Sequence, residues 1–273
     1  IELLAKKNYH TSKEEKNHML LQFKVKNYRS LRDESILDME AAGLGDQKEC
    51  LLKYKNNSYL PVVSINGKNG GGKSNLIRAM WLAAQFIKNA QRTQHETAEV
   101  PVRPFELNDY SKNEPTSFEF EYEEEGIWYC YGFSATRKCI CEEHLYWAPK
   151  GQKSVVVDRK YQDFSFPVNG DKKIKEMISK AVAPNQLFFA VSCTMNYEPC
   201  IEAMKWFRTK LFFSRDYSDL GKNLLEYSDD SEMLKSVASI AKIADIGISD
   251  MKFEIDNKAL SLIHISEPTR RTP

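Results

Sequence analysis

The sequence has no long hydrophobic run, few histidines and almost no net charge. No apolar segment approaches the ~18 residues that a membrane-spanning helix needs, and the N-terminus lacks the charged, apolar and small-residue order of a signal peptide. Six cysteines in 273 residues are too few for a disulfide scaffold. The 39 basic and 38 acidic residues give no electrostatic argument for nucleic acid. We therefore expect a reduced, cytoplasmic globular protein without a membrane segment.

Both ends of the chain differ from ordinary protein sequence. The run from Leu260 back-translates to a string that resembles a sequencing adapter read in frame, so we predict that residues 260–273 are not native. A string that resembles a ribosome-binding site can be written just before Met19, which predicts residues 1–18 as an untranslated leader. A genuine polar extension is the alternative for the N-terminus. The domain is then expected over residues 19–259, cut off near its end.

The spacing of apolar residues predicts one mixed α/β domain. Period-two alternation predicts strands over residues 21–25, 36–39, 118–122, 127–133, 140–147, 154–158 and 251–255, and a β-branched run predicts another over 61–65. Helical spacing predicts helices over residues 74–89, 172–181, 201–211 and 232–244. No internal repeat or low-complexity linker divides the chain.

A glycine-rich segment carries the clearest chemical signal. Residues 67–74 read Gly-Lys-Asn-Gly-Gly-Gly-Lys-Ser, which matches the G-x-x-x-x-G-K-[ST] pattern of a P-loop completely. Glycines there allow backbone N–H groups to converge on phosphate oxygens at a helix N-terminus. We expect Lys73 to neutralise the β- and γ-phosphates and the Ser74 hydroxyl to coordinate Mg²⁺. The predicted ATP-binding residues are Asn66, Gly67, Lys68, Asn69, Gly70, Gly71, Gly72, Lys73, Ser74 and Asn75.

Several strings resemble a family of bacterial ATPases. The turn Asn27-Tyr-Arg-Ser30, the P-loop from Asn69 to Asn75 and the string Tyr129-Cys-Tyr-Gly-Phe133 are similar to ABC-like AAA ATPases related to SMC, RecF and overcoming-lysogenization-defect heads. The resemblance covers residues 19–258. It implies an α/β P-loop NTPase of the ABC-head type, with an antiparallel β insertion in an incomplete N-terminal lobe. It also implies that Arg29 lies near the bound phosphates; a solvated turn arginine is the alternative.

The same resemblance implies a function. Many such proteins act in anti-phage or abortive-infection systems, and two heads sandwich ATP so that the signature of one completes the site of the other. No Leu-Ser-Gly-Gly-type signature occurs between Ser74 and Ala259, which disfavours a transporter and leaves the catalytic residues unassigned. The favoured function is a homodimeric ATPase that gates a nuclease or toxin effector. Two alternatives stay open: a RecF-like repair ATPase that holds DNA, and a nucleotide-binding regulatory module without significant turnover.

Four further strings have weaker patterns. Residues 155–158 resemble a Walker B strand, but Arg159 replaces the expected acid, so we interpret Asp158 as a strand end. The acidic run 123–125 is typical of a solvated hairpin end. The aromatic pairs at 206–207 and 212–213 favour core packing over a stacking platform for nucleic acid.

A cysteine–histidine string could bind zinc. Cys139, Cys141 and His144 offer three ligands, and a closed site would need Cys130 or His95 as the fourth. Because an alternating strand places Cys139 and Cys141 on one face for ordinary packing, we favour packing over a zinc site.

Overall fold

The computed structural model describes residues 18–43, 48–93, 98–167, 171–214, 251–252 and 264–265. The chain divides into two units, Ile1–Leu211 and Phe212–Pro273. In the second unit, the short strands β10 (Met251–Lys252) and β11 (His264–Ile265) pair antiparallel. Within the described ranges, no helix combines the length and the apolar character that crossing a membrane requires.

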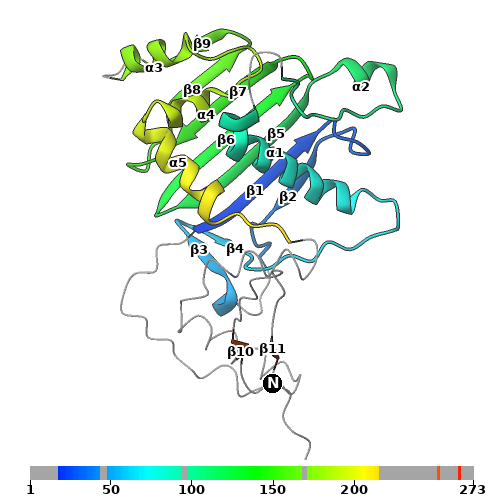
Figure 1. Cartoon of the computed structure of the whole chain (residues 1–273). Helices are drawn as coiled ribbons and strands as arrows, with labels where there is room; N and C mark the ends of the chain where they lie inside the picture. The colour runs from blue at the N-terminus through cyan, green and yellow to red at the C-terminus, as the bar shows by residue number, and fades with distance from the viewer. Residues whose placement is uncertain are drawn as a thin grey trace, which may run out of the picture. The chain divides into compact units, whose positions relative to one another are not determined.

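The first unit is built on a seven-stranded antiparallel sheet. Its strands are β1 (His18–Lys26), β2 (Ser35–Asp38), β5 (Thr116–Glu124), β6 (Ile127–Ala135), β7 (Ile140–Trp147), β8 (Ser154–Lys160) and β9 (Asp163–Ser165). They lie in the order β2-β1-β5-β6-β7-β8-β9 (Figure 1). From β5 onward each strand pairs with the next one along the chain, so local hairpins build most of the sheet.

Helices cover one face of this sheet. Figure 1 shows α1 (Lys73–Thr93), α4 (Phe188–Thr194) and α5 (Glu198–Thr209) on the same side of the strands. Tyr122 of β5 stacks on Trp206 of α5 with ring centroids 4.6 Å apart, and Phe120 meets Phe207 edge to face at 5.2 Å. These arrangements are the ones that aromatic quadrupoles favour, and they give the sheet-to-helix interface a largely aromatic core.

Smaller elements flank this two-layer core. The helix α2 (Asp109–Asn113) precedes β5, α3 (Lys172–Ser179) precedes α4, and the 3-10 turn η1 (Lys48–Cys50) precedes the hairpin of β3 (Leu52–Tyr54) and β4 (Asn57–Tyr59). Tyr59 of that hairpin packs against Met19 and Leu21 of β1 in a small separate cluster.

A buried ion pair joins the sheet to the helical layer. Glu143 of β7 and Arg159 of β8 have fully buried side chains, with Arg159 Nη1 3.1 Å from Glu143 Oε2. The carboxylate also accepts the backbone N–H groups of Phe188 and Phe189, at 2.8 and 2.9 Å, in the first turn of α4. A negative charge at a helix N-terminus is favourable. Arg159 also donates to the carbonyl oxygen of Gln186. The ion pair therefore connects β7 and β8 to the start of α4.

Most of the predicted elements are confirmed, but one strand is not formed. The strands predicted up to residue 158 correspond to β1, β2 and β5 to β8, and three predicted helices correspond to α1, α3 and α5. The strand predicted over 61–65 is wrong, because residues 60–72 are irregular and Val62 is 79% exposed. A β-branched run becomes a strand only beside a partner, and no described strand runs alongside it.

Two predicted elements lie partly or wholly outside the described residues. The helix predicted over 232–244 lies outside the described residues. Of the strand predicted over 251–255, the described part is β10.

Glu123 and Glu124 at the end of β5 are buried, which corrects the prediction of a solvated acidic end for these two residues, whereas Glu125 in the turn is exposed as predicted. Glu123 is 0% exposed and Glu124 is 4% exposed. The backbone N–H of Gly126 donates to the Glu123 carboxylate, and His18 Nδ1 lies 2.8 Å from Glu124 Oε2. Burial raises the pKa of Glu123. The reason is that β1 runs the full length of β5 and pairs Met19 with Glu123, so this end is not a free tip.

Replacing Glu143 by alanine should strongly destabilise the first unit. Arg159 would keep its buried charge without a carboxylate, and breaking a buried pair in this way costs roughly 3–5 kcal/mol. We expect a clear fall in the urea midpoint of the full chain, followed by circular dichroism. The matched control is Asp33→Ala, which breaks the exposed Arg32–Asp33 pair and should leave the midpoint unchanged. Equal midpoints for Glu143→Ala and the wild type would contradict the role assigned to the pair.

Candidate nucleotide-binding site

A glycine-rich loop, residues 66–72, leads directly into the N-terminus of α1. Asn75 N and Leu76 N donate to Gly72 O at 2.8 and 3.0 Å, which closes the first helical turn. The preceding N–H groups of a helix have no acceptor within it, and this first turn contains no acidic residue. The loop therefore ends on a helix N-terminus whose partial positive charge is not neutralised locally, which is an arrangement suited to an anion.

Lys73 folds back over the glycine-rich loop. Its Nζ donates to Gly67 O at 2.6 Å and to Lys68 O at 2.7 Å. The ammonium is thus held over the loop by two carbonyl dipoles, and phosphate oxygens could replace both of them as acceptors. Ser74, the predicted Mg²⁺ ligand, is exposed in the first turn of α1.

The turn that follows β1 packs directly on the glycine-rich loop. Asn75 Nδ2 donates to Ser30 Oγ at 2.7 Å. Gly72 has φ +86°, which favours glycine, and a Cβ there would lie 2.9 Å from Leu31 Cδ2 and displace that side chain. Residues more than forty positions apart are therefore joined into one site. The resemblance predicted this neighbourhood, and the contacts show what holds it together.

Arg29 occupies the apex of this turn. It has φ +49°, its backbone N donates to Arg103 O at 2.8 Å, and its guanidinium lies 5.8 Å from the ring centroid of Tyr28. Its Nε is buried and has no hydrogen-bond partner among the residues that the structure describes. The side chain as a whole is half-exposed. Arg29 thus precedes Ser30 and Leu31, the two residues of the turn that lie against the glycine-rich loop and the start of α1. Its Nε–H is a hydrogen-bond donor without a described acceptor.

Asn27 holds the turn in place. The side chain is 3% exposed, and its Nδ2 donates to the carbonyl oxygens of Ser111 and Glu114 at 2.8 and 2.9 Å. Its Oδ1 accepts the backbone N–H of Phe105 at 3.0 Å. Thr116 Oγ1 donates to the backbone carbonyl of Asn27 at 2.8 Å. No local pattern in the sequence indicates that the amide of Asn27 reaches residues 105–114, so its role could not be predicted from the string that contains it.

The weaker candidates occupy other parts of the sheet. Asp158 is exposed on β8 between two antiparallel neighbours, and Tyr146 Oη donates to its Oδ2 at 3.1 Å, so it is not placed as a Walker B aspartate. Trp206 and Phe207 are 2% and 0% exposed, which confirms core packing for this pair. Core packing is wrong for Phe212, which is 43% exposed.

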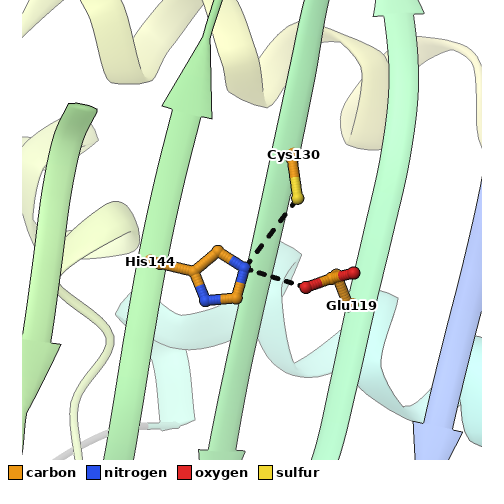
Figure 2. A group of neighbouring side chains, drawn as sticks. All are labelled: Glu119, Cys130 and His144. Atoms are coloured by element: carbon orange, nitrogen blue, oxygen red, sulfur yellow. Dashed lines mark hydrogen bonds and ion pairs between the residues drawn. The ribbon is translucent and has the colours of Figure 1, made fainter. Parts of the chain in front are cut away.

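His144 lies on the opposite sheet face from Cys141, so the strand separates the two residues that the sequence pattern had grouped. Instead, His144 Nε2 lies 3.1 Å from Glu119 Oε2 and 3.9 Å from Cys130 Sγ (Figure 2). The hydrogen bond from His144 lowers the pKa of Glu119 to about 2. Burial raises the pKa of the Cys130 thiol. His95, the other expected partner, lies outside the described residues.

Comparison with known families places this loop in context. A family model described as "AAA domain, putative AbiEii toxin, Type IV TA system" matches residues 62–263, which is most of the chain. The chain belongs to this AAA domain family. No curated protein gives a significant match.

Family membership supports an ATPase-type, nucleotide-binding domain of mixed α/β structure. The matched part of the AAA domain includes the glycine-rich loop, α1 and the strands β5 to β9, whereas β1, β2 and the turn after β1 precede it. The expected membership of an AAA/ABC-like ATPase family is thus confirmed at this level.

Replacing Asn27 by glycine should destabilise the turn after β1. Glycine tolerates the φ of +55° at this position, so the change removes the amide without adding backbone strain. Buried carbonyl and N–H groups would lose their partners, at a cost of about 1–3 kcal/mol. We expect a lower melting temperature of the full chain by calorimetry. Asn196→Gly is the matched control, because Asn196 has φ +57° but is exposed, and it should melt like the wild type. If both variants melt alike, the amide of Asn27 does not hold the turn.

Proposed function

We propose that the AAA domain is an ATP-binding head that holds Mg·ATP at residues 66–75. The observation that carries this proposal is the position of Lys73, whose ammonium lies over the glycine-rich loop at the N-terminus of α1. A triphosphate supplies the anionic oxygens that such a helix end and lysine favour. The absence of an Asn-Lys-x-Asp string from the sequence favours ATP over GTP.

Each residue of the loop has a defined part in this proposal. Lys73 exchanges its two carbonyl acceptors for the β- and γ-phosphate oxygens, and Ser74 offers its exposed hydroxyl to Mg²⁺. Gly72 keeps the loop in contact with Leu31, so the turn after β1 forms one wall. Arg29 would direct the accessible part of its guanidinium from that wall toward the phosphates, because a guanidinium binds oxygen pairs well.

Hydrolysis and signalling form the second part of the proposal. We infer that the cytoplasmic protein hydrolyses ATP as a homodimer and thereby gates an effector, a toxin or a nuclease, in anti-phage defence. The description of the family, which refers to a putative toxin of a type IV toxin–antitoxin system, supports a link to an effector of this kind. The resemblance to ABC-like heads, in which the signature of one head completes the site of the other, suggests that part of the charge-stabilising shell would come from the second head. The nearly balanced charge of the chain gives no support to the DNA-holding alternative.

The substitution Lys73→Ala should weaken ATP binding. A charge-assisted hydrogen bond contributes roughly 1.5–3 kcal/mol, so the dissociation constant of Mg·ATP should rise about ten- to more than a hundredfold. The measurement is equilibrium titration of the full chain with a fluorescent ATP analogue in Mg²⁺. The same titration with the GTP analogue should show weaker binding in the wild type.

Lys180→Ala is the matched control for charge. Lys180 is an exposed lysine at the end of α3, so its removal changes the net charge equally without touching the loop. Circular dichroism should show the same cooperative melting for both variants and the wild type. An unchanged ATP affinity in Lys73→Ala would refute the proposed site.

A further inference from the structure

The sheet face opposite the helices carries a compact group of three potential metal ligands. Glu119, Cys130 and His144 stand on the adjacent strands β5, β6 and β7, and one ligand atom from each lies within 4.8 Å of the others (Figure 2). Cys130 is 6% exposed, whereas the side chains of Glu119 and His144 are each 25% exposed. The group is therefore largely shielded from the sheet side and reachable from solvent on the other. It contains none of the residues of the proposed ATP site.

The separations are close to those that a tetrahedral metal requires. Zinc bonds of 2.3 Å to sulfur and about 2.0–2.2 Å to nitrogen and oxygen place neighbouring ligand atoms about 3.4–3.6 Å apart. The observed separations from His144 Nε2 are 3.9 Å to Cys130 Sγ and 3.1 Å to Glu119 Oε2. The third separation, between Cys130 Sγ and the Glu119 carboxylate, is within 4.8 Å, so side-chain shifts of roughly 1 Å, within the reach of side-chain rotation, would bring the three donors onto one ion.

Gly132 makes this arrangement sterically feasible. It lies between the cluster residues in the ladder, opposite Glu119 on β5 and opposite His144 on β7. A Cβ on Gly132 would lie 2.5 Å from His144 Cε1 and 2.7 Å from Nε2. The imidazole therefore lies across the β6 backbone and reaches Glu119, two strands away, only because this position has no side chain. Stacking on Tyr146, with centroids 4.9 Å apart, further orients the ring.

Lys24 supplies the outer contact that a ligating carboxylate usually has. Its Nζ donates to Glu119 Oε1 at 2.8 Å, while the other oxygen, Oε2, faces His144. One carboxylate oxygen is thus oriented by a cation and the other is directed at the cluster. Partners of this kind fix the orientation of the ligand, and their loss typically costs ten- to a hundredfold in metal affinity.

We propose that Glu119, Cys130 and His144 form a binding site for Zn²⁺ on the open face of the sheet. The donor set combines a thiolate, an imidazole and a carboxylate, which are the three ligand types that zinc takes in proteins. Binding forms a zinc–sulfur bond and releases the thiol proton of Cys130 to solvent. Three protein ligands leave a fourth position for water, so this is an open site. This inference is independent of ATP binding.

The test is zinc binding by the full chain in reductant after treatment with a chelator. Calorimetric titration with Zn²⁺ should show a site that Cys130→Ser and His144→Ala each weaken by roughly a hundredfold or more, and Glu119→Gln by at least tenfold. Titration with Co²⁺ reports the ligands directly, because a thiolate bound to cobalt gives a charge-transfer band. That band should be present in the wild type and absent from Cys130→Ser.

Matched variants separate this site from other donors in the chain. Cys139→Ser removes a half-buried thiol, and Glu121→Gln removes a carboxylate 3.9 Å from Lys24; both should bind zinc like the wild type. Gly132→Ala keeps all three ligands but displaces the imidazole, so it should also weaken binding. Melting curves of the metal-free variants identify any variant that fails to fold. The variants that do fold still test whether the three residues bind zinc. A wild type that binds no zinc, or binding that Cys130→Ser and His144→Ala leave unchanged, would overturn the proposal.

Discussion

Side chains alternate between two faces along β5, β6 and β7, and the rest of the structure depends on this two-residue period. On one face Phe120 and Tyr122 meet the rings of α5, which builds the core. On the other face Glu119 and His144 meet across Gly132. Since a shift of one residue in register would exchange these faces, the unbroken pairing of β5 with β6 fixes both the core and the polar cluster at once.

The turn after β1 joins the proposed ATP site to the sheet. The glycine-rich loop is mostly exposed, and its contacts with the body of the unit include Ser30 and Leu31. That turn adopts left-handed backbone at Asn27 and Arg29, which costs free energy unless the surroundings offset it. The buried amide of Asn27 provides this compensation through hydrogen bonds to three different residues. The site thus combines a mostly exposed glycine-rich loop with a turn whose conformation is fixed by buried hydrogen bonds.

Two ion pairs between a carboxylate and a cation, one on each face of the sheet, have different roles. Glu143 and Arg159 are enclosed in the core, where each must be paired to be tolerated, and they join β7, β8 and α4. Glu119 and Lys24 are partly solvated on the open face, where the pair is exchangeable with water and ions. The Glu143–Arg159 pair therefore stabilises the packing of the strands on α4, whereas the Glu119–Lys24 pair leaves one carboxylate oxygen of Glu119 available to a ligand.

The local patterns of the sequence were enough to predict the hairpin-rich sheet, the helices α1, α3 and α5 and the glycine-rich loop. Periodicity and the P-loop string depend only on residues close together in the chain. Tertiary structure alone decided that residues 61–65 form no strand, that Glu123 is buried, and that His144 meets Glu119 and Cys130 rather than Cys141. It also decided that Asn75 bonds to Ser30 and that Glu143 reaches the start of α4. Each of these outcomes depends on which distant strand or helix lies alongside, and long-range register leaves no trace in a local pattern.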